Sequence, residues 1–147
     1  MREIKFRGKR RDNGEWVYGY YICIGTGENR HHIGEIVRWN FTELYKVIPE
    51  TVGQFTGLKD KDGKEIYEGD VVEKTNPECQ FQKSIIHCIV VWEDDRYMLK
   101  VCNVFLWEHY NVEKHENGTF LFFSWIHKDC YKIIGNTTDN PELLEEK

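Results

Sequence analysis

A glycine- and aspartate-rich stretch near the middle of the chain, GQFTGLKDKDGKEIYEGDVV from Gly53 to Val72, constrains the fold most. Its Asp62-Gly63 pair is the type that a tight hairpin turn requires, since glycine accepts a positive φ and aspartate tolerates it. An extended pattern follows this pair, and a second turn is predicted at Glu68-Gly69-Asp70. The stretch therefore predicts a chain that reverses direction twice inside a β-sheet.

Two ligand-binding interpretations of the same stretch fail on spacing. In a calcium-binding EF-hand loop with Gly63 at position 6, Asp60 and Asp62 fill positions 3 and 5, but position 1 falls on Leu58 and position 12 on Gly69. A phosphate-binding Walker loop needs GxxxxGK followed by serine or threonine, and no such spacing occurs. We therefore interpret the stretch as structural turns.

Short runs of β-branched and aromatic residues at hairpin-like intervals occupy the rest of the chain. They predict strands over residues 3–8, 16–24, 33–39, 41–48, 71–74, 85–92, 97–107, 120–126 and 131–134. Asn140 as a cap and Pro141 at the first helical position predict a short terminal helix. This pattern favours an all-β sandwich or small barrel.

Composition and charge make some classes of protein, such as nucleic-acid-binding and membrane proteins, less compatible with this sequence. The chain has 147 residues, of which 40% are hydrophobic, and this suits a single domain with a core. Its formal net charge of -5 is not typical of a nucleic-acid-binding protein. No apolar segment reaches the roughly 20 residues of a membrane helix, and the charged N-terminus has no secretory pattern, so we expect a cytoplasmic protein without a membrane partner.

The residues that could carry catalysis or bind metal show no recognisable spacing. The five cysteines and six histidines lack the repeated close pairs of a zinc site, and neither serine, Ser84 or Ser124, lies in a nucleophile elbow. We expect no metal, no cofactor and no enzymatic activity. A Cys/His nucleophile assembled in space stays open as an alternative.

The predicted N-terminal strand is basic, and we expect an aromatic strand to lie next to it. Basic and aromatic residues together can form a platform for single-stranded nucleic acid, and the candidates for it are Lys5, Arg7, Lys9, Arg10 and Arg11, with Trp16, Tyr18 and Tyr20 on the neighbouring strand. The other interpretation is an edge strand protected by charge, with the aromatic residues in the core. The acidic total favours this second interpretation.

Three blocks of sequence resemble the YopX-like proteins of bacteriophages and prophages. They are residues 2–8 with 14–19, residues 48–58 with 62–72, and residues 131–136 with 140–144. The resemblance implies a single YopX-like domain comprising an N-terminal β extension (residues 1–50), a small SH3-like β-barrel (51–135) and a tail with a short helix (136–147). It brings no catalytic residues. The family motif, which we interpret as structural turns, comprises Gly53, Gln54, Phe55, Thr56, Gly57, Asp62, Gly63, Ile66, Tyr67, Gly69 and Asp70.

These observations together predict a non-enzymatic binding module in the cytoplasm of a bacterial host. We expect it to act through contacts with a protein partner or with copies of itself, because SH3-like folds offer sheet edges and loops for such binding. The alternative is a nucleic-acid-binding accessory protein that uses the basic N-terminal strand.

Overall fold

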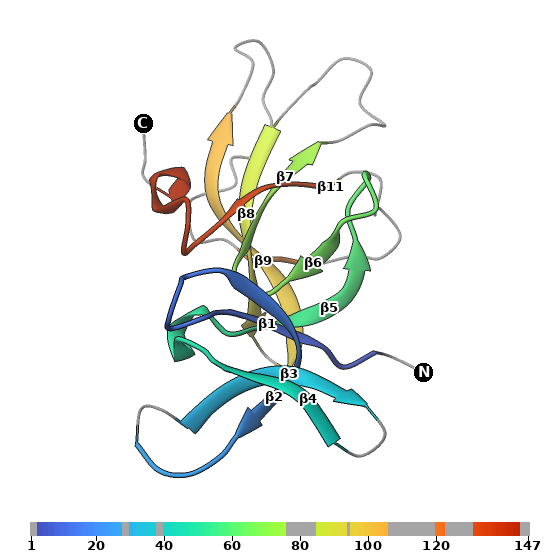
Figure 1. The fold of residues 1–147 in the computed structure, drawn as a ribbon. Coiled ribbons are helices and arrows are strands. Elements are labelled where there is room, and N and C mark those ends of the chain that lie inside the picture. Colours follow the sequence, from blue (N-terminus) through green and yellow to red (C-terminus); the bar gives the residue numbers. More distant parts are fainter. Residues whose placement is uncertain are drawn as a thin grey trace. The chain divides into compact units, whose positions relative to one another are not determined.

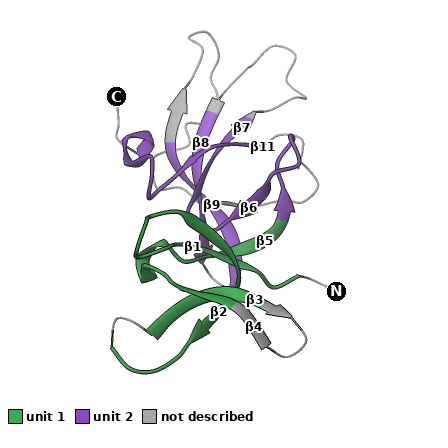
Figure 2. Ribbon diagram, viewed as in Figure 1, with its two compact units in different colours: residues 1–57 green, residues 58–147 purple. Residues whose placement is uncertain are grey.

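The computed structural model describes residues 3–27, 30–37, 40–75, 85–93, 95–105, 120–122 and 131–144. In this part of the chain, strands form two antiparallel sheets, and the helical structure consists of two short 3-10 helices (Figure 1). The chain divides into two compact units, residues 1–57 and residues 58–147 (Figure 2). The all-β prediction is confirmed, whereas the division at residues 50 and 135 stays a prediction.

The first unit contributes β4, β3, β2, β1 and most of β5 to a six-stranded sheet with the order β4-β3-β2-β1-β5-β6, of which β6 is Glu65–Tyr67. Its elements are β1 (Phe6–Lys9), β2 (Trp16–Cys23), β3 (His31–Val37), β4 (Asn40–Lys46), the 3-10 helix η2 (Pro49–Thr51) and β5 (Gly53–Lys59), which continues into the second unit. Ile33 and Val47 are buried against Gly8, where a Cβ atom would lie 3.0 Å from Ile33 Cδ1. The interpretation of the basic strand as an edge strand is wrong, because β1 pairs with β2 on one side and with β5 on the other.

Strand β2 changes partner halfway along its length. Its first half pairs with β1, ending at the Phe6–Gly19 pair, and its second half pairs with β3, beginning at the Tyr20–Gly34 pair. At this crossover Gly19 has a φ of +149°, and a Cβ atom there would lie 2.5 Å from the Gly34 carbonyl oxygen. Only glycine suits this backbone conformation and this close approach of two strands.

The second unit contains the five-stranded sheet β10-β9-β8-β7-β11. Its elements are β6 (Glu65–Tyr67), β7 (Asp70–Thr75), β8 (Ile85–Glu93), β9 (Arg96–Phe105), β10 (Phe120–Phe122), β11 (Tyr131–Asn136) and the 3-10 helix η4 (Pro141–Leu144). Alternate residues of the strands enter one core cluster, which consists of Ile66, Val72, Ile86, Cys88, Val90, Leu99, Val101 and Tyr131.

The hairpin between β5 and β6 reverses where the sequence predicted, although by a different turn. Asp60 N–H donates to the Lys64 carbonyl over 2.8 Å, and Gly63 N–H donates to the Asp60 carbonyl over 3.0 Å. The loop is therefore three residues long, and Gly63 (φ +82°) takes its left-handed position, as in a hairpin that ends in a glycine bulge. Gly69 lies at the second reversal, whereas Gly57 lies inside β5, so its assignment to a reversal is wrong.

Two finer expectations about the fold are not confirmed. Within the described residues the outermost strands of each sheet do not pair with one another, so the strands form open sheets and not a closed barrel. The terminal helix is reduced to the four residues of η4, which begins after Asn140 as predicted but has 3-10 geometry. Leu143 N–H donates to the Asn140 carbonyl, a spacing of three residues.

Candidate functional site: a tyrosine groove in the first unit

The basic side chains of β1 are packed on an indole ring. Arg7 and Lys9 share one face of the strand, as alternation requires, and both lie over Trp16, with Arg7 Cζ 4.8 Å and Lys9 Nζ 5.7 Å from its ring centre. Arg7 is only 7% exposed. A cation over the face of tryptophan is attracted by the ring quadrupole. The guanidinium of Arg7 therefore contributes to the packing of the first unit and is largely withdrawn from solvent.

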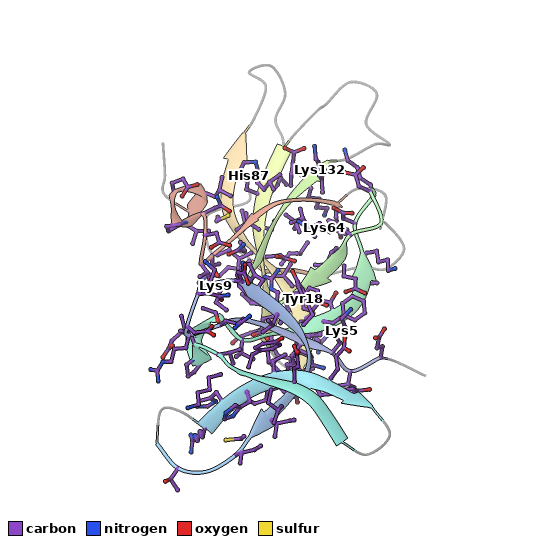
Figure 3. The ribbon with its side chains drawn as sticks, in the orientation of Figure 1. Lys5, Lys9, Tyr18, Lys64, His87 and Lys132 are labelled. Atoms are coloured by element: carbon purple, nitrogen blue, oxygen red, sulfur yellow. The ribbon has the colours of Figure 1, made fainter. Side chains whose placement is uncertain are left out.

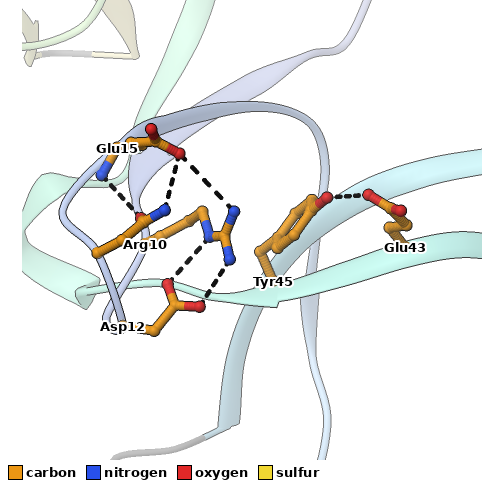
Figure 4. Close-up of polar contacts among 6 residues, drawn as sticks. Arg10, Asp12, Glu15, Glu43 and Tyr45 are labelled. Carbon is orange, nitrogen blue, oxygen red and sulfur yellow. Dashed lines mark hydrogen bonds and ion pairs between the residues drawn. The ribbon is translucent and has the colours of Figure 1, made fainter.

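Arg10 is held by its own neighbours in the chain (Figure 4). Its guanidinium donates to both carboxylate oxygens of Asp12, over 3.0 Å and 2.6 Å, and lies 3.9 Å from Glu15 Oε2. The guanidinium also lies over the Tyr45 ring, with Cζ 4.3 Å from the ring centre. The hydrogen bond to Asp12 raises the pKa of Arg10, and the same bond lowers the pKa of the Asp12 carboxyl group. Two carboxylates thus offset the charge of Arg10 locally.

The remaining two basic candidates lie elsewhere in the unit. Lys5 precedes β1 and accepts a 2.7 Å hydrogen bond from Phe55 N–H through its carbonyl group, while Arg11 lies in the exposed turn after β1. The five basic residues therefore differ in their surroundings: Arg7 is buried, Arg10 is paired with carboxylates and Arg11 is exposed.

The aromatic residues of β2 also depart from the expectation that they fill the core. Tyr18 is 47% exposed and Tyr20 is 49% exposed. Both lie on the same face of β2, because residues two apart in a strand point to the same side. Ile4, which is 58% exposed, is a third large apolar side chain on the surface of this unit.

These three exposed side chains border one hollow, which we call the tyrosine groove. It has a volume of about 340 Å³ and is lined by Glu3, Ile4, Lys5, Tyr18, Gly19, Tyr20 and Glu35. Figure 3 shows Lys5 and Tyr18 among the side chains of this region. The groove lies where β2 leaves β1 and joins β3, and the crossover residue Gly19 is part of its lining. The sequence analysis did not identify Ile4 and Glu35 as residues of a candidate site. The sequence signal that could have pointed to this site is the pair of tyrosines, Tyr18 and Tyr20, on either side of Gly19.

The turns of the family motif have a structural role in the second unit. The buried Asp60 carboxylate accepts hydrogen bonds from Asp62 N–H and Lys64 N–H, both over 2.9 Å, and from Ile133 N–H over 3.1 Å. Asp70, which is 1% exposed, accepts from Tyr67 N–H over 2.8 Å. Ile66 and Tyr67, which lie between the two turns in the sequence, are buried. These carboxylates satisfy backbone donors, which is the role of an aspartate in a turn and not of an ion ligand.

The cysteines and histidines do not assemble into a recognisable catalytic or metal site in the described part of the chain. No three His, Cys, Asp or Glu side chains there are placed to hold a metal ion. The exposed Cys23 is the cross-strand partner of His31, but both ring nitrogens of His31 are engaged, by the Tyr21 hydroxyl and by Arg30 Nε. An imidazole held in this way is poorly placed to accept a proton from the thiol. Cys79, Cys130, His109, His115 and His127 lie outside the described residues.

Comparisons with known proteins agree with the sequence blocks and with the fold. A family model described as "YopX protein" matches residues 5–145. The crystal structure of protein EF1440 from Enterococcus faecalis superposes with a TM-score of 0.54 at 22% identity, over 99% of this chain and 100% of that one. This likeness shows a common fold. A search of curated proteins found no match. Among the described residues, no helix is long and apolar enough to cross a membrane.

Proposed function

The chain belongs to the YopX protein family, and from that premise we propose that it is a non-enzymatic binding module that holds a protein partner in the tyrosine groove. Five large hydrophobic side chains are exposed among the described residues, and three of them, Ile4, Tyr18 and Tyr20, border this one hollow. This clustering carries the proposal, because exposed apolar side chains that are grouped mark interaction sites more often than scattered ones do.

The identity of the side chains supports a protein ligand. Tyrosine offers a large contact area with an apolar ring and a polar hydroxyl, and it loses little conformational entropy when it is ordered, since it has only two side-chain torsions. The charged residues Glu3, Lys5 and Glu35 also line the hollow. Protein-binding surfaces usually combine apolar and polar side chains in this way.

The resemblance to phage and prophage proteins supports a place for this module in the cytoplasm of an infected or lysogenic bacterial cell.

The alternative function, nucleic-acid binding through β1, is less well supported. Arg7 is buried on Trp16, and Arg10 is paired with Asp12 and Glu15. Two carboxylates also line the groove beside Lys5, where they would repel phosphate.

Affinity capture with matched variants tests the proposal. Wild-type protein and a Tyr18→Ala/Tyr20→Ala variant are used to capture proteins from infected cells, and a candidate that only the wild type retains is then purified. We expect its affinity, measured by calorimetry, to fall at least about tenfold in the double variant, as the loss of two central aromatic contacts implies. A Trp92→Ala variant serves as the control, because it removes an exposed aromatic residue of the second unit. Equal affinities for the wild type and the double variant would contradict the proposal.

A titration against fluorescent single- and double-stranded DNA and RNA tests the alternative function, nucleic-acid binding. Phosphate binding weakens steeply with salt. Salt-dependent binding that disappears when Arg7, Lys9, Arg10 and Arg11 are replaced by alanine would establish the nucleic-acid function in place of the proposed one. Absence of binding at low salt would exclude it.

A further inference from the structure

We propose that the end of the β2–β3 hairpin is a pH-sensitive switch, in which a neutral His31 holds the side chain of Arg30 and a protonated His31 releases it. The inference is independent of the tyrosine groove and of its partner. It follows from the hydrogen bonds of the His31 ring, from the groups that surround this ring, and from a second contact of Arg30 that protonation leaves intact.

The His31 ring joins two side chains at the end of the hairpin. Its Nδ1 atom forms a hydrogen bond with the Tyr21 hydroxyl group, and Arg30 Nε donates to its Nε2 atom over 3.3 Å. A guanidinium group has only donors and keeps its charge at any ordinary pH, so the direction of the second bond is fixed. His31 Nε2 must therefore be without a proton, and the single proton of the neutral ring lies on Nδ1.

Protonation of His31 has different effects on its two contacts. Both ring nitrogens of an imidazolium carry a proton. Nδ1 already donates to the Tyr21 oxygen in the neutral form, so this contact persists. At Nε2 the new N–H group faces the donor of Arg30, and two positive charges lie side by side, which disfavours the contact. The Arg30 side chain is therefore held only while His31 is neutral.

Tyr21 keeps the His31 ring in place in both states. The two rings are stacked, with their centres 5.9 Å apart, and on its own side Tyr21 packs on Phe6, with the centres 5.6 Å apart. Burial raises the pKa of Tyr21, so its hydroxyl group keeps its proton at neutral pH. His31 therefore stays oriented by Tyr21, and the side chain that moves is that of Arg30.

The surroundings of His31 make its contact with Arg30 sensitive to protonation. In the described part of the chain, the groups packed against it are Tyr21 and Cys23 on β2, Arg30 just before β3, and Val47, whose N–H donates to the His31 carbonyl over 3.0 Å. This set includes one cation and no carboxylate. A carboxylate would favour the imidazolium and would also hold the guanidinium, whereas the tyrosine hydroxyl does neither.

The neighbouring His32 holds Arg30 in a way that does not depend on pH. Its Nδ1 atom lies 3.1 Å from the Arg30 carbonyl oxygen, and a carbonyl group only accepts, so this nitrogen is the donor. Ile24 N–H donates to the same oxygen over 2.8 Å. A protonated ring donates more strongly than a neutral one, so protonation of His32 preserves its contact. Acidification should therefore release the side chain of Arg30 and leave its backbone in place.

NMR of the histidine ring nitrogens in the full chain tests the inference, because the shift of each nitrogen shows whether it carries a proton. At about pH 8, where histidines are ordinarily neutral, we expect His31 to carry its proton on Nδ1 and to show nuclear Overhauser effects to the side chain of Arg30. At about pH 5 we expect two protonated nitrogens and the loss of these effects. A neutral His31 with its proton on Nε2, or a contact with Arg30 that survives protonation, would overturn the inference.

Two matched substitutions assign the effect to one histidine. In His31→Gln the Arg30 side-chain signals should no longer change between the two pH values, whereas in His32→Gln the change should be as large as in the wild type. The reverse result, or equal changes in both variants with the fold intact by circular dichroism, would contradict the assignment. The wild-type titration decides the question even if a variant does not fold. Protonation of His31 and release of Arg30 must share one midpoint, and different midpoints would show that the two events are not coupled.

Discussion

Asp60 Oδ2 accepts a hydrogen bond from the backbone N–H of Ile133 over 3.1 Å, although the two residues are 73 positions apart in the sequence. The other oxygen of the same carboxylate accepts from two N–H groups of the turn that follows Asp60. In addition, Lys61 N–H donates to the Tyr131 carbonyl over 3.0 Å. The turn of the family motif is thus tied to β11, the strand that carries the third block of the YopX resemblance.

Replacing Asp60 with alanine should destabilise the second unit by about 2–4 kcal/mol, because it leaves backbone donors without their buried acceptor. Urea unfolding measures this change. Asp62→Ala is the control, since Asp62 is exposed, and a surface substitution of this kind changes stability by no more than about 0.5 kcal/mol. Equal effects of the two substitutions would show that the link between Asp60 and Ile133 contributes nothing.

Replacing Gly63 with valine should lower the melting temperature. Gly63 has a φ of +82° and a Cβ atom there would meet nothing within 4 Å, so the cost is backbone strain alone. A left-handed conformation costs a residue with a Cβ atom about 1–2 kcal/mol, and a β-branched side chain resists it further. Thermal unfolding followed by circular dichroism would detect this loss, and an unchanged midpoint would remove the argument for the turn.

Replacing Gly19 with alanine should cost more than replacing Gly14. Both glycines have a positive φ, but only at Gly19 would a Cβ atom collide with backbone, 2.5 Å from the Gly34 carbonyl oxygen. We expect about 1–2 kcal/mol for Gly14→Ala and a clearly larger loss for Gly19→Ala. Gly19→Ala should also weaken binding in the tyrosine groove, because the crossover of β2 shapes it. Similar unfolding free energies for the two variants would be inconsistent with a close approach of β2 and β3.

The second unit should lose stability as the pH falls through the range in which His87 titrates. Burial lowers the pKa of His87 below its usual value, and the carboxylate of Glu73, 3.9 Å away, offsets this only in part. Because the unfolded chain takes up the proton more readily, the stabilisation is present above about pH 6.5 and is lost as the pH falls through the lower pKa of the folded state. His87→Gln should show a shallower loss of unfolding free energy between pH 7 and 5, and an unchanged slope would count against this role.

Thiol labelling should distinguish the described cysteines by their burial. Cys23 is exposed, Cys88 and Cys102 are buried, and burial raises the pKa of the Cys88 thiol to about 12. Since the thiolate is the reactive form, a variant with Cys79 and Cys130 replaced by serine should react rapidly at Cys23 alone at neutral pH. In denaturant all three remaining thiols should react. Rapid labelling of Cys88 in the folded protein would reopen the question of a buried nucleophile.

The sequence by itself determined most of the elements of this fold. Alternating apolar residues predicted most strands, because side chains in a strand point to opposite faces at every step, although β5 was not among the predicted strands. Glycines placed the two turns between β5 and β7, because few other residues accept a positive φ. The blocks at the two ends of the chain and in its centre were enough to identify the family. These are local properties, which each short segment carries in its own residues.

Only the tertiary structure determined which strands lie side by side and which of their side chains are buried or exposed. Sequence pattern could not show that β1 is an interior strand, that Arg7 is buried on Trp16, or that Tyr18 and Tyr20 are exposed, because each depends on which strand lies beside which. The tyrosine groove arises where β2 exchanges β1 for β3, and a change of partner leaves no periodic signal in the chain. Pairing between distant strands therefore determines the candidate site, whereas local preferences determine the strands themselves.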